Sequence, residues 1–229
     1  MAPNRTPYVV VTGTNSGIGA AIARRLLADG RHVAGFDRAV PVIDHLAFVP
    51  IEVDLMDHAA TLAVASRIAA VSAFVHAAGI MRAGRLGALD HETGVALWRL
   101  HVDAAVTLAD HFSPRMPRGG RIVLIGSRTA RGVAGKSQYA GVKAALVGLA
   151  RSWAKELASV DITVNVVAPA ATETAMLTDP ARAGTPPEVP PIGRLIKPEE
   201  IAALVAFLLS EDASAITGQE IAICGGASL

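Results

Sequence analysis

Short runs of consecutive apolar residues alternate along the chain with longer stretches in which apolar residues recur at helical spacing. Two of these runs are V-V-V at residues 9–11 and I-V-L-I at residues 122–125. Strands that are apolar at every position are typical of parallel sheets with helices on both faces. The alternation therefore predicts an α/β fold built on a doubly wound parallel sheet of seven strands.

The expected strands cover residues 8–11, 32–36, 48–53, 73–77, 121–126, 162–168 and 220–224. Helices are expected to begin near Gly17, Asp57, Asp90, Ser137 and Pro198. The stretch at residues 170–193 interrupts this alternation with Pro180, Pro186, Pro187, Pro190 and Pro191. Long loops in compact domains are usually functional, so we expect a short substrate lid at about 170–193 within a single domain spanning residues 1–229.

Composition narrows the choice of partners. The chain has 229 residues, 52% of them hydrophobic, which is enough for one large core. Lys and Arg total 21 against 20 Asp and Glu, a net charge of +1, so we expect a small-molecule substrate and no nucleic acid or membrane partner. One cysteine, Cys224, excludes an internal disulfide and offers no metal cluster. The apolar run at residues 201–209 is too short to span a bilayer, and we expect a cytoplasmic protein.

A glycine-rich motif, T-G-T-N-S-G-I-G at residues 12–19, separates the first expected strand from the first helix. Gly13 permits a tight turn, Gly17 lets the backbone approach a pyrophosphate, and Gly19 lets the helix pack on the strand. The helix N-terminus then attracts the negative charge. This placement predicts a Rossmann-type dinucleotide site, whose candidate residues are Gly13, Asn15, Ser16, Gly17, Ile18 and Gly19.

Two acidic residues follow the next strands. Asp37 lies about 20 residues past the glycines, where a carboxylate can bind the adenosine ribose. A carboxylate there repels a ribose 2′-phosphate, which favours NAD over NADP, although Arg38 could attract that phosphate. Asp54, followed by Leu55, is either a turn residue or a contact to the adenine. All four are candidate cofactor-binding residues.

The candidate catalytic residues are Ser127, Tyr139 and Lys143. Tyr and Lys four residues apart share one helix face, so the ammonium can lie near the phenol oxygen and lower the phenol pKa. Ser127 stands at the end of a strand, where it can donate a hydrogen bond to a substrate oxygen. Together with the glycine motif, these residues predict hydride transfer with proton exchange at Tyr139.

In this order the motifs resemble the short-chain dehydrogenase/reductase family over residues 9–226. The resemblance includes A-A-G at Ala77, Ala78 and Gly79 and the segment from Pro169 to Thr174. It implies that Tyr139 is the general acid/base, that Lys143 also holds the nicotinamide ribose, and that Thr174 contacts the nicotinamide. Ala77, Ala78, Gly79, Pro169, Thr172 and Thr174 join the implied cofactor-binding residues.

Three residues depart from the family pattern. His101 stands where the family usually carries the Asn of its catalytic tetrad, and His can take part in a proton relay or can be structural. His76 also replaces a usual Asn, and we interpret it as a packing or backbone-bonding residue. Cys224 replaces a usual Asp near the last strand's end, and we interpret it as structural.

The substrate is expected to lie among residues 78–85, 128–138 and the lid. Arg82, Arg128 and Arg131 either bind a carboxylate there or are solvated. Similarity to the branch that oxidises dihydrodiols suggests an NAD-dependent oxidoreductase acting on a small cyclic alcohol or dihydrodiol. The alternatives are an NADP-dependent 3-oxoacyl-type ketoreductase and a non-catalytic, dinucleotide-sensing protein on the same fold.

The expected helix at residues 138–158 is apolar on more than one face. A helix of this kind is buried on several sides, so we expect part of it to meet the same helix of another subunit. The sequence thus predicts a homo-oligomer, a dimer or tetramer.

Overall fold

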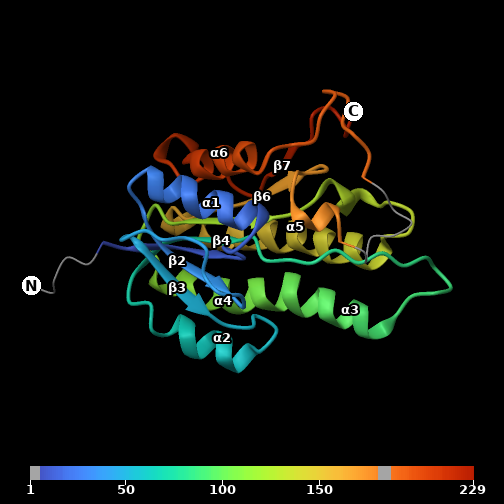
Figure 1. Cartoon of the computed structure of the whole chain (residues 1–229). Helices are drawn as coiled ribbons and strands as arrows, with labels where there is room; N and C mark the ends of the chain where they lie inside the picture. The colour runs from blue at the N-terminus through green and yellow to red at the C-terminus, as the bar shows by residue number, and fades with distance from the viewer. Residues whose placement is uncertain (1–5, 180–186) are drawn as a thin grey trace, which may run out of the picture.

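The computed structural model describes residues 6–179 and 187–229, and in these residues seven parallel strands form one sheet (Figure 1). The strand order is β3-β2-β1-β4-β5-β6-β7. The strands are β1 (Tyr8–Thr12), β2 (His32–Asp37), β3 (Phe48–Glu52), β4 (Val71–His76), β5 (Arg121–Ile125), β6 (Thr163–Pro169) and β7 (Glu220–Ile223). The predicted doubly wound α/β fold is confirmed.

Helices cover both faces of this sheet (Figure 1). They are α1 (Gly17–Ala28), α2 (His58–Ala65), α3 (His91–Trp98), α4 (Ala104–Phe112), α5 (Ser137–Leu157) and α6 (Pro198–Leu208). Side chains that alternate along β1 explain the two layers. Val9 and Val11 pack with α1 and α6, whereas Val10 packs with α4 and α5 on the other face. Both cores are apolar, which accounts for the continuous apolar runs.

The helices begin at or next to the expected residues. Asp57 accepts a hydrogen bond from the Ala60 N–H, and Asp90 accepts one from the Thr93 N–H, so each carboxylate caps the helix that follows it. Strand β4 begins at Val71, two residues earlier than expected, because polar Ser72 interrupts the apolar run without interrupting the strand. A π-helical turn, Arg99–Asp103, joins α3 to α4 and was not predicted.

In the described part of the loop-rich stretch after β6, residues Ala175–Leu177 form a short 3-10 turn, and Thr172 forms a bridge with Ile196. Pro180 and Pro186 of the expected lid lie outside the described residues. Within residues 6–179 and 187–229, no helix combines the length and apolar character needed to cross a membrane.

Candidate active site

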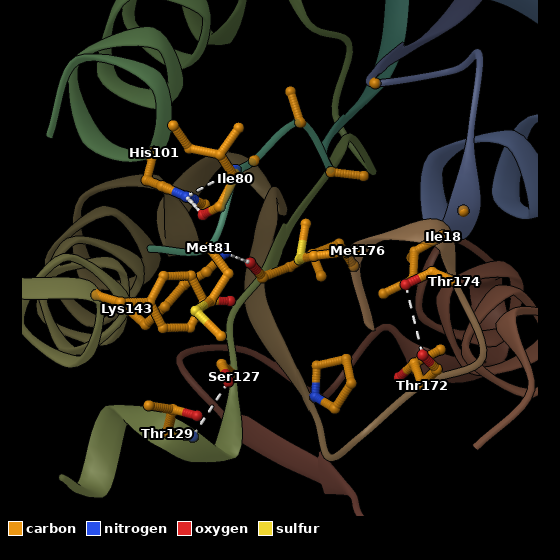
Figure 2. Close-up of a pocket in the computed structure, with 18 of the residues that line it drawn as sticks. Ile18, Ile80, Met81, His101, Ser127, Thr129, Lys143, Thr172, Thr174 and Met176 are labelled. Atoms are coloured by element: carbon orange, nitrogen blue, oxygen red, sulfur yellow. Dashed lines mark hydrogen bonds between the residues drawn. The ribbon is translucent and has the colours of Figure 1, made fainter. Parts of the chain in front are cut away.

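A cavity of about 840 Å³ opens at the carboxyl ends of the strands. Its walls come from the segments that follow β1 through β6, with Gly13 after β1 and Ala77 after β4. Strand order reverses between β1 and β4, and sheets of this kind bind ligands at that point. Figure 2 shows the side chains that project into the cavity.

The structure brings nearly all of the predicted site residues to this one cavity. Those on its wall are Gly13, Ser16, Gly17, Ile18, Gly19, Asp37, Arg38, Asp54, Leu55, Ala77, Ala78, Gly79, His101, Ser127, Tyr139, Lys143, Pro169, Thr172 and Thr174. Asn15 is not part of the wall. Its backbone N–H donates to Asp37 Oδ2 at 2.9 Å and its side-chain amide donates to the Ala39 carbonyl, so it braces the glycine-rich turn against the end of β2.

The glycine-rich turn leaves no room for a side chain at Gly13 or Gly19. A Cβ on Gly19 would lie 2.1 Å from the Gly13 carbonyl oxygen, and a Cβ on Gly13 would lie 2.9 Å from the Ala78 Cα. Gly13 also has φ +74°, which favours glycine. Since α1 begins within this turn, its N-terminal N–H groups are available to a phosphate. The turn therefore fits a dinucleotide pyrophosphate.

Acidic groups at the ends of β2 and β3 line the adjoining part of the cavity. Asp37 accepts backbone N–H bonds from Asn15 and, at 3.0 Å, from Ala39. Asp54 accepts the Met56 N–H at 2.9 Å, so it forms a turn and lines the cavity at once. The Arg38 side chain is exposed at the same wall.

Tyr139 and Lys143 project from the first turns of α5 and are both buried. Lys143 Nζ lies 5.7 Å from the centre of the Tyr139 ring and donates to the Ile125 carbonyl at 2.7 Å. Burial lowers the pKa of Lys143 to about 7. The site thus places a titratable amine beside a phenol in a region of low dielectric, where the protonated amine acts strongly on the phenol.

Ser127 lies two residues after β5 and caps the N-terminus of the short helical turn Arg128–Arg131. Its Oγ accepts the Thr129 N–H at 3.1 Å, which fixes the hydroxyl oxygen in the cavity (Figure 2). The hydroxyl proton can then be donated to a substrate oxygen. On the other side of the cavity, Thr174 Oγ1 donates to the Thr172 carbonyl at 3.4 Å.

His101 lies in the π turn and is 1% exposed. Its Nε2 lies 2.8 Å from the Ile80 carbonyl oxygen and 3.2 Å from the Ile80 nitrogen, so it donates to the carbonyl in one tautomer and accepts the N–H in the other. The ring stands edge-on to Tyr139 with 5.6 Å between ring centroids. Nδ1 has no hydrogen-bond partner within the described parts of the chain. Burial, and then the charge of Lys143, hold the pKa of His101 well below its usual value. Gly79 makes room for the ring, because a Cβ there would lie 2.3 Å from His101 Cε1.

Sequence reasoning missed several residues of the wall. Met81, Met176 and Leu177 form an apolar part of it, and their positions in the expected substrate loops were the available signal. Leu100 and Ala227 also line the cavity, and no motif marks either residue.

The three arginines of the expected substrate loops lie in different places. Arg128 lines the cavity, and Arg131 is exposed and is not part of the cavity wall. Arg82 forms a 3.0 Å ion pair with Asp179. Arg82 also donates to the Met81 carbonyl at 2.8 Å. The pair ties the segment after β4 to the start of the lid stretch.

Comparison with known proteins assigns the chain to a family. The family model described as enoyl-(acyl carrier protein) reductase matches residues 13–228. The chain is 37% identical over 227 residues to the 3-oxoacyl-[acyl-carrier-protein] reductase MabA of Mycobacterium bovis, covering 95% of this chain and 91% of that protein. It is 38% identical over 233 residues to the 3-oxoacyl-[acyl-carrier-protein] reductase FabG of Salmonella typhimurium, covering 95% of each.

Among solved structures, a short chain dehydrogenase from Burkholderia cenocepacia J2315 in complex with NADP is similar, with a TM-score of 0.84 and 33% identity. The match covers 98% of this chain and 99% of that one. With the glycine-rich turn and the Ser127, Tyr139 and Lys143 cluster in one cavity, the chain is a nicotinamide-dependent oxidoreductase that acts on CH–OH groups. It belongs to the short-chain dehydrogenase/reductase family.

Proposed function

We propose that this enzyme interconverts a 3-oxoacyl thioester and its 3-hydroxyacyl form. The observation that carries the proposal is the meeting of Ser127, Tyr139 and Lys143 with the glycine-rich turn in one cavity. The relatives with 37–38% identity are named as 3-oxoacyl reductases, which supports this substrate class. The apolar wall of Met81, Met176 and Leu177 suits an acyl chain.

Each catalytic side chain has a role that follows from its contacts. Tyr139 transfers a proton to or from the substrate oxygen. The protonated form of Lys143, whose Nζ lies 5.7 Å from the centre of the Tyr139 ring, stabilises the phenolate form of Tyr139 through its charge. Ser127, held by the Thr129 N–H, donates a hydrogen bond to the same substrate oxygen. A bound nicotinamide dinucleotide supplies the hydride acceptor or donor.

The other substrate class expected from the sequence lacks comparable support. The small cyclic alcohol or dihydrodiol rested on two short sequence stretches, V-A-G-F-D-R at residues 33–38 and A-A-G-I-M-R-A-G at residues 77–84, whereas the relatives resemble the chain over 95% of its length. The dinucleotide-sensing alternative rested on His101, because this residue replaces the usual Asn of the family's catalytic tetrad. It loses its basis because the chain belongs to a family of oxidoreductases and retains Ser127, Tyr139 and Lys143.

For the cofactor, we propose that Asp37 and Arg38 together determine the choice between NAD and NADP. The Asp37 carboxylate at the end of β2 opposes a 2′-phosphate, whereas exposed Arg38 on the same wall can bind one. The expected preference for NAD finds no support in the comparisons, since the Burkholderia structure contains NADP. Both dinucleotides therefore belong in the assay.

We also propose a homo-oligomer that forms through α5. The residues of α5 that face away from the core include Gly141, Ala144 and Gly148, which are small and exposed. Their spacing of three and four residues places them on one face of the helix. Such a face lets a second helix approach closely.

The first test is oxidation of NADPH and NADH by the purified enzyme with a 3-oxoacyl thioester such as acetoacetyl-coenzyme A. We expect Tyr139→Phe to lower kcat by at least about 100-fold, because proton transfer from the phenol is lost. Dinucleotide affinity, measured by NADPH fluorescence, should change little. Turnover of cyclic alcohols or dihydrodiols without turnover of any 3-oxoacyl thioester would contradict the proposed substrate class.

A further inference from the structure

Thr12, the last residue of β1, is the centre of a buried group of hydrogen bonds. Its Oγ1 accepts the N–H groups of Ala77 and Ala78, both at 3.0 Å. These two bonds occupy the acceptor sites of a hydroxyl oxygen, so the hydroxyl proton has to go to another neighbour. That neighbour is His76 Nδ1, at 3.1 Å. Thr12 is 0% exposed and His76 1%.

This arrangement fixes the tautomer of His76. Because Nδ1 accepts from Thr12, the ring proton lies on Nε2, which donates to the Leu100 carbonyl at 3.1 Å. A protonated imidazole would place a second donor against the Thr12 hydroxyl. Burial and the charge of Lys143 lower the pKa of His76 to about 3, which agrees with a neutral ring.

Leu100 and His101 are consecutive residues of the π turn. His76 Nε2 donates to the Leu100 carbonyl, and His101 Nε2 forms a hydrogen bond with the backbone of Ile80. Two adjacent residues of the turn are therefore attached to the end of β4 and the segment after it. The attachment sets the His101 ring edge-on against Tyr139.

The other end of the chain of bonds reaches the glycine-rich turn. Thr12 directly precedes Gly13, and Gly13 packs against Ala78 so closely that a Cβ would lie 2.9 Å from the Ala78 Cα. Through Thr12, the bonds to Ala77 and Ala78 fix this contact. His76 thus stands between the part of the cavity that fits a dinucleotide and the turn that carries His101.

We propose that His76 is a positioning residue, which joins the glycine-rich turn to His101 through the ordered bonds Ala77 and Ala78 to Thr12, Thr12 to His76, and His76 to Leu100. The proposal rests on the function proposed above, with Tyr139 as the proton-transfer group. A role limited to packing is the competing explanation, since His76 fills space between β4 and the π turn.

Two amide substitutions test the hydrogen bonds of the two His76 ring nitrogens separately. The side-chain oxygen of Asn occupies the place of Nδ1, and the side-chain nitrogen of Gln occupies the place of Nε2. His76→Asn keeps the acceptor for Thr12 and loses the donor to Leu100. His76→Gln keeps the donor to Leu100 and loses the acceptor for Thr12.

The experiment measures kcat with a 3-oxoacyl thioester and the NADPH dissociation constant for the full-length enzyme and both variants, well below their melting temperatures. We expect His76→Asn to lower kcat about tenfold and to lower it more than His76→Gln does, because a buried carbonyl loses its donor. His76→Gln should weaken dinucleotide binding more than His76→Asn does. If both variants only lower the melting temperature, or lower kcat equally without affecting binding differently, the positioning role is wrong.

Nitrogen NMR of ¹⁵N-histidine-labelled enzyme shows which ring nitrogens carry a proton, and it therefore tests the same hydrogen bonds without measuring turnover. We expect His76 to be neutral with its proton on Nε2 from pH 6 to 9, and the His101 signals to shift in His76→Asn. A proton on His76 Nδ1, or unchanged His101 signals in that variant, would overturn the proposal. An inactive wild-type enzyme with the expected NMR signals would instead contradict the substrate assignment alone.

Discussion

At the scale of single residues, the proposed choice of cofactor depends on one carboxylate and one guanidinium. Asp37 contributes negative charge and Arg38 positive charge to the same wall of the cavity. We expect Asp37→Asn to raise the ratio of kcat/KM for NADPH over NADH by about tenfold, because a repulsion of about 1 kcal/mol or more is removed. Arg38→Ala should shift the same ratio toward NADH. Initial rates with both dinucleotides measure this ratio. An unchanged ratio in both variants would show that neither side chain recognises the substituent at the 2′ position.

Lys143 gives the stability of the enzyme a defined pH dependence. Burial lowers its folded pKa to about 7, below the unfolded value of about 10.4. Between these values the unfolded chain binds more protons, so this residue's contribution to the free energy of unfolding rises with pH. Below pH 7 its destabilising effect is complete.

We therefore expect the free energy of unfolding of Lys143→Met, relative to wild type, to be highest at pH 6. Its relative free energy of unfolding should fall by up to about 1.4 kcal/mol per pH unit between pH 7 and 9. Urea unfolding of the cofactor-free proteins at pH 6, 7, 8 and 9 measures the difference. A difference that is constant over this range would mean that Lys143 has an ordinary pKa in the folded enzyme.

At the scale of elements, the glycine-rich turn admits no added side chain at Gly19. Its Cβ would meet backbone atoms of Thr12 and Gly13, which cannot rotate away. We expect Gly19→Ala to destabilise the enzyme by about 1–3 kcal/mol and to abolish tight dinucleotide binding, because the turn has to open. Chemical unfolding and NADPH fluorescence titration test the two effects. Retained affinity would show that α1 shifts without disturbing the turn.

The sequence predicts elements better than it predicts the contacts between them. Apolar runs and capping residues such as Asp57 and Asp90 located strands and helix starts, because their signals are local. The π turn differs from an α-helix in its backbone hydrogen bonds, whereas the pattern of apolar residues is unchanged, so periodicity did not reveal it. The bond from His76 to the Leu100 carbonyl was equally hidden, since a backbone acceptor leaves no mark in the sequence.

The candidate site shows the same division. Its glycines and the Tyr139 and Lys143 pair could be predicted, because one motif and one helical spacing contain them. Asn15 could not be separated from its neighbours, although it turns toward Ala39 while Ser16 lines the cavity. Which way a side chain leaves a turn depends on backbone angles that the motif does not encode.

At the scale of the whole molecule, the outer face of α5 and a tryptophan next to it are exposed, although their composition suits contact with another subunit. Gly141, Ala144 and Gly148 lie on the outer face of α5, and Trp98 of neighbouring α3 is 47% exposed. The same helix supplies Tyr139 and Lys143 from its inner face. Association through α5 would therefore brace the helix that holds the catalytic pair.

This arrangement predicts that the enzyme is a dimer or tetramer at micromolar concentration and that Gly148→Glu reduces its size. A carboxylate on this face would be buried without a partner in the assembly, at a cost large enough to separate the subunits. Ala59→Glu, on the exposed first turn of α2, adds the same charge away from α5 and serves as the matched control. Light scattering of the three proteins gives their masses. A monomeric wild-type enzyme, or a Gly148→Glu variant with the mass of the wild type, would place the subunit contact elsewhere or remove it altogether.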